Sequence, residues 1–187
     1  MAKKGGGTNA PVNNLANNGV YVLMDEITMQ SCADCLKWIM NQNLAETRLP
    51  QLTIIINSPG GDVHAAFALI DTMKASTIPI KTVGLGLIAS CGFLIFIAGK
   101  KGSRILTPNT SILSHQYSWG SAGKEHELYA RVKEFELSTA RMMDHYKKCT
   151  GLSEKKIREI LLPAEDVWLS AKEAVKYGIA DKIVSTY

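Results

Sequence analysis

One apolar segment, Val83–Ala98, contains a single hydroxyl group, that of Ser90. Its 16 residues would span about 24 Å as a helix at ~1.5 Å per residue, whereas the hydrocarbon core of a bilayer is roughly 30 Å thick. We therefore expect the segment to lie in the interior of a soluble protein. A polar side chain in such a place either has a buried partner or points into a functional site.

Ser90 lies at a predicted bend between two structural elements. Val83–Ile88 is typical of a buried strand, and the glycine and alanine residues around Ser90 let other backbone approach its hydroxyl. If a helix begins just after the bend, its free N–H groups can stabilise negative charge beside the oxygen. Ser90 is thus a candidate nucleophile. Capping of the same helix is the alternative, and on this segment alone it is the commoner role of a serine.

The composition of the chain is that of an ordinary globular protein. Its 187 residues suffice for one domain with its own core. The formal net charge is only +4, and basic residues are interspersed with acidic ones, so we expect no nucleic-acid partner and no membrane partner. Residues 1–18 are rich in Gly and Asn and contain no apolar run, which predicts a flexible N-terminal arm rather than a secretory signal.

The cysteines do not form a recognisable metal or disulfide pattern. Cys32 and Cys35 make a C-x-x-C pair, but no second pair or nearby histidine completes a tetrahedral set. Because the pair lies in a helical apolar pattern, we interpret it as part of a core face. Cys149 stands alone near a helix end. This usage predicts a protein without a bound metal in a reducing cytoplasm.

A strand, a glycine turn, a helix and a second strand precede the Ser90 bend. Leu52–Ile56 is a continuous β-branched run, Asn57–Gly61 ends it, and Asp62 begins a helix. Ile80–Leu85 is the next strand, which makes a βαβ unit with a parallel sheet. Functional sites gather at the carboxyl ends of such strands, so the glycine turn and Ser90 should be neighbours. The turn lacks the lysine of a P-loop and the spacing of a dinucleotide site, so we set phosphate binding aside.

The rest of the chain contains short elements with recognisable ends. Thr28 is a plausible cap for the first helix, Gly151 ends a long helix and Ser153 caps the next. We expect a strand at 20–24, a helix at 28–43, strands at 104–107 and 111–114, helices at 124–149 and from 153 to Pro163, an extended piece at 166–169, a helix at 170–177 and a strand at 182–184.

The predicted helix 124–149 is long, about 39 Å at ~1.5 Å per residue. Apolar and small residues alternate along it by four and three, which is a seam for another helix. They are Leu128, Val132, Phe135, Thr139, Met142 and Tyr146. The helix either lies on its own sheet as a crossover or forms an arm that packs on another subunit. We favour the arm, because a small domain rarely needs a helix of this length.

One of the four histidines stands apart from the others. His115 directly follows the strand 111–114 and precedes a polar loop, which is where a general base would be placed. His64, His126 and His145 lie in polar surroundings on predicted helices, and we expect them on solvated faces.

Ser90, His115 and Asp166 together make a Ser-His-Asp set. A hydroxyl is a poor nucleophile near neutral pH until a base removes its proton, and the base needs a third group to fix its tautomer. The order Ser, His, Asp differs from that of α/β-hydrolases, and the G-x-S-x-G elbow is absent. Glu165, adjacent to Asp166, is the alternative acid.

Several short motifs stand in a fixed order between about Gly19 and Val184. They are Asn57-Ser58-Pro59-Gly60-Gly61, Ala89-Ser90-Cys91-Gly92, His115-Gln116, Trp168-Leu169-Ser170-Ala171, Glu173-Ala174, Tyr177-Gly178 and Asp181. At these separations the chain resembles the ClpP family, the proteolytic subunits of the caseinolytic protease. The resemblance implies a serine endopeptidase with Ser90 as nucleophile, His115 as base and Asp166 as its orienting acid. It implies an oxyanion hole made by the N–H groups of Gly61 and Cys91, with no metal and no cofactor.

The resemblance also implies a crotonase-like α/β fold, a βαβ spiral with a protruding handle at about 116–149, within a peptidase domain at 19–187. It implies rings of seven subunits, stacked in pairs, whose chamber receives peptides or unfolded proteins from an ATP-driven AAA+ unfoldase. Three features depart from the family. Cys91 stands where methionine is common, Ala164-Glu165 replaces an acidic residue and arginine, and the N-terminal arm lacks hydrophobic character.

Two other functions are compatible with this chain. A non-catalytic ring subunit would shape a mixed assembly without cleaving peptides, although such members usually lack a triad residue. An acyl-CoA enzyme of the same broad fold would use the same two N–H donors on a thioester, but it would leave Ser90 and His115 without a task. Within the peptidase hypothesis, the Cys91 thiol is the rival nucleophile.

Overall fold

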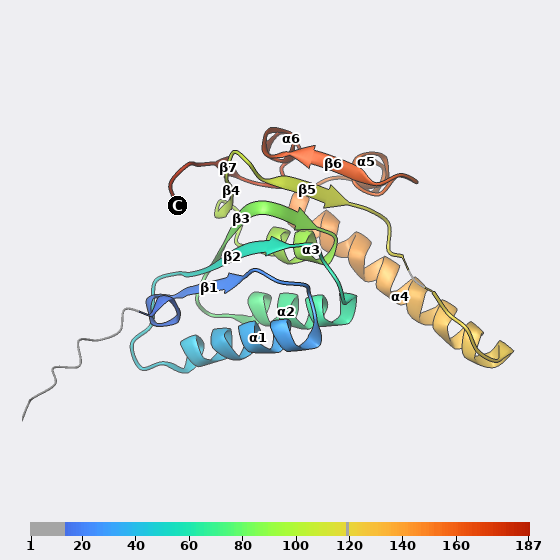
Figure 1. Ribbon diagram of the computed structural model, residues 1–187, viewed down its shortest axis with the longest axis horizontal. Helices are drawn as coiled ribbons and strands as arrows, with labels where there is room; N and C mark the ends of the chain where they lie inside the picture. The colour runs from blue at the N-terminus through green and yellow to red at the C-terminus, as the bar shows by residue number, and fades with distance from the viewer. Residues whose placement is uncertain (1–13, 119) are drawn as a thin grey trace, which may run out of the picture.

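The computed structural model describes residues 14–118 and 120–187, which form a seven-stranded sheet with helices packed against it (Figure 1). The strands are β1 (Val20–Leu23), β2 (Leu52–Ser58), β3 (Ile80–Ala89), β4 (Arg104–Leu106), β5 (Ser111–Ser114), β6 (Val167–Ser170) and β7 (Lys182–Ile183). The helices are the 3₁₀-helix η1 (Leu15–Asn18), α1 (Met29–Leu44), α2 (Val63–Ala75), α3 (Cys91–Ile97), α4 (Glu125–Thr150), α5 (Glu154–Ile160) and α6 (Ala171–Lys176).

The strand β3 is the centre of the sheet and leads directly to Ser90. One edge of β3 pairs with β2, and its other edge pairs first with β4 and then with β5. The sheet runs in the order β1-β2-β3-β4-β7, and β6 pairs with β5. In the described part of the chain every strand pair is parallel except β5–β6, which confirms the predicted parallel sheet and βαβ unit.

Helix α3 is the most buried element of the helical layer. All of its residues are buried, and it packs against α2, α4 and three strands of the sheet. The helices α1 and α2 lie side by side below the sheet in Figure 1 and contact each other. Burial of α3 on every side explains why Cys91–Ile97 is apolar without alternation. Across 14–118 and 120–187, no helix is both long and apolar enough to cross a bilayer.

The predicted helix ends are confirmed by their hydrogen bonds. The side chains of Thr28, Asp62 and Ser153 each accept a hydrogen bond from a backbone N–H in the first turn of α1, α2 and α5. Gly151 ends α4 with a φ of 78°, a left-handed conformation that glycine adopts without strain. The local signals therefore locate these elements to within a residue or two.

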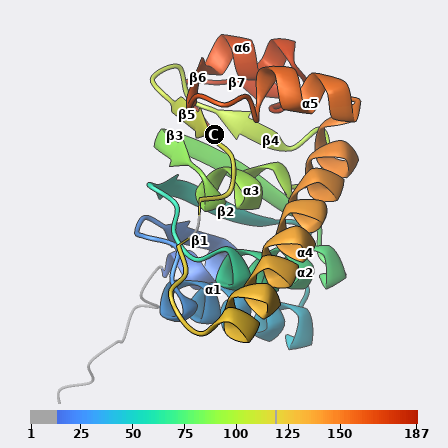
Figure 2. The ribbon, with the colours of Figure 1, turned by 90° about the vertical axis from the view of Figure 1, so that its right-hand side faces the viewer.

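The two halves of α4 have different surroundings. Its C-terminal half packs on the core, where Met142 and Tyr146 are buried, whereas Tyr129 near its start is 69% exposed. Figure 1 shows the first turns of α4 extending beyond the sheet, and Figure 2 views the molecule from the side toward which they extend. The long helix therefore packs on its own core at one end and protrudes at the other. The packing of the protruding half on another subunit stays a prediction.

The end of the predicted N-terminal arm has a defined structure. Residues 1–13 lie outside the described range, but Leu15–Asn18 form η1. The carbonyl oxygen of Ala16 accepts hydrogen bonds from Trp38 Nε1 at 3.2 Å and Gln42 Nε2 at 3.0 Å. These two side chains of α1 attach the start of the described chain to the body of the protein.

A buried ion pair attaches the C-terminal strand to the sheet. Arg104 on β4 is only 1% exposed, and its Nη2 lies 2.7 Å from Oδ1 of Asp181, which stands just before β7. Its Nη1 also donates to the carbonyl of Cys149 in the last turn of α4, at 2.9 Å. One guanidinium thus joins β4, α4 and the β7 segment.

Candidate active site

Ser90 occupies a strained turn between β3 and α3. Its φ of 52° and ψ of −120° make it the one non-glycine residue with positive φ in the described chain. Its side chain makes no capping hydrogen bond to α3, so the capping interpretation is not supported. Its N–H donates to the carbonyl of Leu113 on β5 at 2.9 Å. Such strain costs about 1–3 kcal/mol and is concentrated at functional sites.

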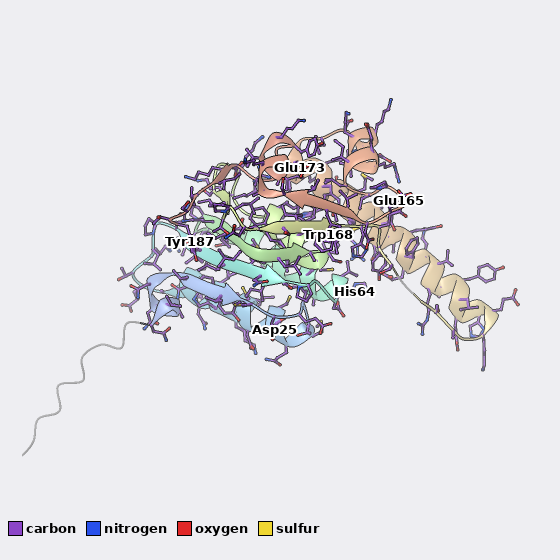
Figure 3. The ribbon with its side chains drawn as sticks, turned by 45° about the horizontal axis from the view of Figure 1, so that its top comes forward. Asp25, His64, Glu165, Trp168, Glu173 and Tyr187 are labelled. Carbon is purple, nitrogen blue, oxygen red and sulfur yellow. The ribbon has the colours of Figure 1, made fainter. Side chains whose placement is uncertain are left out.

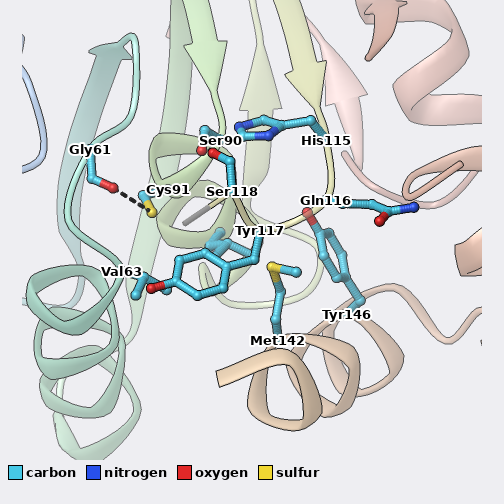
Figure 4. Close-up of a pocket in the computed structure, with 11 residues that line it drawn as sticks. Gly61, Val63, Ser90, Cys91, His115, Gln116, Tyr117, Ser118, Met142 and Tyr146 are labelled. Carbon is cyan, nitrogen blue, oxygen red and sulfur yellow. Dashed lines mark hydrogen bonds between the residues drawn. The ribbon is translucent and has the colours of Figure 1, made fainter. Parts of the chain in front are cut away.

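Four of the predicted site residues line one pocket of about 60 Å³, namely Gly61, Ser90, Cys91 and His115. Figure 4 shows the imidazole of His115 beside Ser90, with Gly61 and Cys91 on the other side of the serine. In the described chain no direct hydrogen bond joins Ser90 to His115. Catalytic hydrogen bonds are often long before substrate binds, so the arrangement is compatible with proton transfer.

The glycine turn after β2 touches the Ser90 bend, as predicted from the parallel sheet. A Cβ atom on Gly60 would lie 2.6 Å from Cβ of Ser90 and 2.9 Å from the carbonyl oxygen of Ala89. On Gly61, a Cβ atom would lie 2.2 Å from the carbonyl oxygen of Ile27. Both glycines have positive φ, of 97° and 144°. The turn is therefore confined between Ile27 and the serine, and only glycine fits at either position.

Two backbone N–H groups beside Ser90 have no acceptor in the part of the chain that the structure describes. Cys91 is the first residue of α3, so its N–H has no partner within the helix. The N–H of Gly61 makes no hydrogen bond, whereas those of Gly60 and Asp62 do. Unpaired N–H groups at a pocket are available to an oxygen of a ligand, and two of them can stabilise a developing oxyanion.

The thiol of Cys91 is not poised as a nucleophile. Its Sγ donates to the carbonyl oxygen of Gly61 at 3.2 Å, and the side chain is buried. Burial raises the pKa of this thiol to about 11. Because the thiolate is the reactive form, a thiol that stays protonated at neutral pH favours Ser90 as the nucleophile.

Asp166 lies at the end of the β5–β6 ladder rather than in the pocket. The antiparallel register pairs Ser114 with Val167, so one further step would place His115 opposite Asp166. Asp166 is exposed, and among the described residues no ion pair joins it to His115. The neighbouring Glu165 also faces outward at this end of β6 (Figure 3). The choice of the acid therefore remains a prediction.

Two side chains of β5 and the loop after it attach the segment that precedes Asp166. Ser114 Oγ donates to the carbonyl of Leu161 at 2.6 Å, and Gln116 Nε2 donates to the carbonyl of Pro163 at 2.9 Å. These residues flank His115 in the sequence, so the strand end that carries the imidazole also holds the chain leading to the acid.

Comparison with known proteins places the chain in a family. The sequence model of the Clp protease family matches residues 3–187. The chain belongs to the Clp protease family. It is 33% identical over 165 residues to ATP-dependent Clp protease proteolytic subunit 1 of Chlamydia muridarum, covering 87% of this chain and 84% of that protein. It is 33% identical over 162 residues to ATP-dependent Clp protease proteolytic subunit 2 of Nocardia farcinica, covering 86% of this chain and 76% of that protein.

The Clp protease family has a crotonase-like α/β fold, and the sheet and helices of this chain agree with it. The predicted fold class and the resemblance noted in the sequence are therefore confirmed. Among residues 14–118 and 120–187, no three His, Cys, Asp or Glu side chains are grouped so that they could hold a metal ion.

Sequence reasoning missed the contribution of α4 to the pocket of this Clp protease family member. Met142 and Tyr146 line the pocket together with Tyr117 from the loop after β5. The hydroxyl of Tyr146 lies 3.3 Å from Ser114 Oγ, and burial raises its pKa far above the usual range. The apolar seam of the helix was visible in the sequence, but the pattern does not say which part of a seam faces a pocket.

The prediction that His145 lies on a solvated face is wrong. Its side chain is 2% exposed, Nε2 lies 2.8 Å from the carbonyl oxygen of Leu94, and Nδ1 lies 3.3 Å from Lys74 Nζ. Burial lowers the pKa of His145 to about 4, with Lys74 adding to the effect and the Leu94 contact opposing it. The polar neighbours of His145 in sequence face solvent, whereas its own position faces α3.

Proposed function

We propose that this protein is a serine endopeptidase in which Ser90 attacks the scissile carbonyl and His115 is the general base. The observation that carries the proposal is the strained backbone of Ser90 in a pocket shared with His115 and two unpaired N–H groups. A helix cap would need neither the strain nor the imidazole. The membership of the chain in the Clp protease family supports the same conclusion.

In this mechanism His115 takes the proton of the Ser90 hydroxyl as the oxygen attacks the peptide carbonyl. The N–H groups of Gly61 and Cys91 stabilise the oxyanion of the tetrahedral intermediate. The intermediate collapses to an acyl-enzyme as His115 donates the proton to the leaving amine, and water then hydrolyses the acyl-enzyme by the same steps. Asp166 orients the imidazole. The β5–β6 register and the bonds from Ser114 and Gln116 support this role.

We also propose that residues 19–187 are the peptidase domain of a chambered, ATP-dependent protease. Its subunits would form heptameric rings, singly or stacked in pairs through α4 and the loop before it, and act on peptides or unfolded proteins in the cytoplasm. The relatives are named proteolytic subunits of an ATP-dependent protease, which implies an unfoldase partner of the AAA+ class. The projecting first turns of α4 offer the surface such stacking needs.

The test compares wild type with Ser90→Ala and Cys91→Ala for peptide hydrolysis and for labelling by a fluorophosphonate. We expect Ser90→Ala to abolish labelling and to lower turnover by roughly a millionfold with its circular dichroism unchanged. Mild alkylation at neutral pH should leave wild-type activity intact. Normal turnover by folded Ser90→Ala would refute the proposal, and inactivation by alkylation together with loss of activity in Cys91→Ala would favour the thiol.

A non-catalytic ring subunit is the second candidate. The observation that favours it is that Asp166 is exposed and lies outside the pocket that Ser90 and His115 line. Failure of a serine-directed probe to label the protein, both alone and in rings mixed with an active homologue, would support this function instead. Native mass spectrometry of the same samples would give the number of subunits.

A further inference from the structure

We propose that the Cys91 side chain is a positioning residue that sets the geometry of the oxyanion hole. Its thiol donates a hydrogen bond to the Gly61 carbonyl and so joins the glycine turn to the start of α3. This inference rests on the proposed serine mechanism, in which the N–H groups of the same two residues receive the oxyanion.

Three of the four backbone polar groups of Gly60 and Gly61 have hydrogen-bond partners. The N–H of Gly60 donates to Ser58 Oγ at 3.2 Å, and the carbonyl of Gly60 accepts from Ile27 N–H at 2.8 Å. The N–H of Asp62 donates to the Ile27 carbonyl at 2.7 Å. With the Cys91 contact, the N–H of Gly61 is the group that remains without an acceptor in the described chain. The Gly61 N–H is thus available to a ligand in the pocket, while hydrogen bonds fix the other three groups.

Of these contacts, only the one from Cys91 reaches the helix that supplies the second donor. The bonds from Ile27 and Ser58 hold the turn to β2 and to the segment before α1. The close approach of Gly60 to Ser90 prevents the turn from moving inward, but it provides no attraction that would prevent an outward movement. The thiol supplies that attraction, so a single residue controls the separation between its own N–H and that of Gly61.

The chemical state of Cys91 suits this task. The thiol is 5% exposed, and its raised pKa of about 11 keeps the proton on sulfur at neutral pH, so it remains a donor. A thiol is a weak donor. Here, however, the hydrogen bonds of the Gly60 carbonyl and the Asp62 N–H to Ile27 already hold the Gly61 carbonyl in place. Methionine, which the resemblance gives as common at this position, has no S–H and could not make the contact.

The experiment compares Cys91→Ala, which removes the donor, with Cys91→Ser, which keeps one. Cys32→Ala is the matched control, because Cys32 is also a buried thiol, 2% exposed on α1, and does not line the pocket. The measurements are kcat and KM for a peptide substrate, the rate of fluorophosphonate labelling, and hydrogen exchange of the segment 58–63.

We expect Cys91→Ala to lower kcat and the labelling rate about tenfold while KM changes less than twofold, because a misplaced donor affects the transition state. Exchange in 58–63 should become faster, Cys91→Ser should recover most of the loss, and Cys32→Ala should resemble wild type. Equal kcat in wild type and Cys91→Ala, or equal losses in the alanine and serine variants, would overturn the positioning role.

The outcomes separate this inference from the function on which it rests. If wild type reacts with the fluorophosphonate and Cys91→Ala reacts equally fast, the positioning role fails and the serine mechanism stands. If wild type does not react at all, the serine mechanism fails and the positioning role falls with it.

Discussion

Gly60 lies directly against Ser90, although α2 and β3 separate the two residues in the chain. A Cβ atom on Gly60 would be 2.6 Å from Cβ of Ser90, a distance that real Cβ atoms essentially never show. The carboxyl ends of two neighbouring parallel strands thus meet without room for a side chain. This contact brings the Gly61 N–H to the serine and explains why residue 60 is glycine.

We expect Gly60→Ala to lower peptidase activity at least a hundredfold, because displacing one oxyanion donor costs about 10²–10³ in kcat. Gly102→Ala is the matched control. Its φ of 90° is also left-handed, but a Cβ atom there would meet nothing within 4 Å. Gly102→Ala should lose about 1–2 kcal/mol of stability from backbone strain. Gly60→Ala should lose more, because its methyl group also clashes with Ser90. Urea unfolding measures both losses. Equal activity in the two variants would contradict the role of the contact.

Asp166→Asn should lower kcat by about 10³–10⁴, because the amide cannot stabilise the imidazolium or hold the required tautomer of His115. Glu165→Gln is the matched control, since the two carboxylates are adjacent and both are exposed. Its kcat should remain within a factor of three of wild type. A large loss in Glu165→Gln with normal Asp166→Asn would transfer the role to Glu165.

Arg104→Met should destabilise the protein by about 3–5 kcal/mol, because it leaves a partly buried carboxylate without its partner. The control is Arg158→Met, which removes a 2.8 Å ion pair to Glu154 whose two side chains are 60% and 51% exposed, and which should cost about 0–1 kcal/mol. Chemical denaturation at pH 7 measures both. A cost below 1 kcal/mol for Arg104→Met would show that the buried pair does not stabilise the fold.

The Arg104–Asp181 ion pair makes the stability of the fold depend on pH. Burial opposes ionisation of Asp181, but hydrogen bonds from Arg104 and Gly102 outweigh it and lower its pKa below the ordinary value of 3.8. A depressed carboxyl pKa contributes stability that is complete above about pH 3.8 and is lost as the pH falls further. The difference in stability between wild type and Asp181→Asn should therefore shrink as the pH is lowered through this range. A difference that is constant with pH would contradict the assignment.

His145 should give the stability of the fold a second pH dependence, at higher pH than that of Asp181. Its pKa is about 4 in the folded chain and 6.5 ordinarily, so the unfolded chain binds the extra proton between these values. Stability should fall as the pH is lowered from 6.5 to 4, by up to about 3 kcal/mol for this group. His145→Gln should have a shallower slope in that interval. An unchanged slope, measured by urea denaturation at each pH, would show that His145 is not neutral in the folded state.

The sequence alone determined the order and type of the elements and the place of Ser90 among them. Apolar periodicity, caps such as Thr28 and Asp62, and the glycine turn are local signals, and each reports the backbone within a few residues of itself. The parallel βαβ unit then follows from connection rules, and it predicts that the glycine turn and Ser90 lie together at one edge of the sheet.

Only the tertiary structure decided what surrounds each side chain. His145 is buried because α3 covers its face of α4. No sequence pattern within α4 indicates that another helix lies there. The Cys91 thiol became a donor, and the Gly61 N–H remained unpaired, because β2 and α3 end at the same edge of the sheet. Such relationships depend on distances between segments far apart in the chain, which local periodicity does not encode.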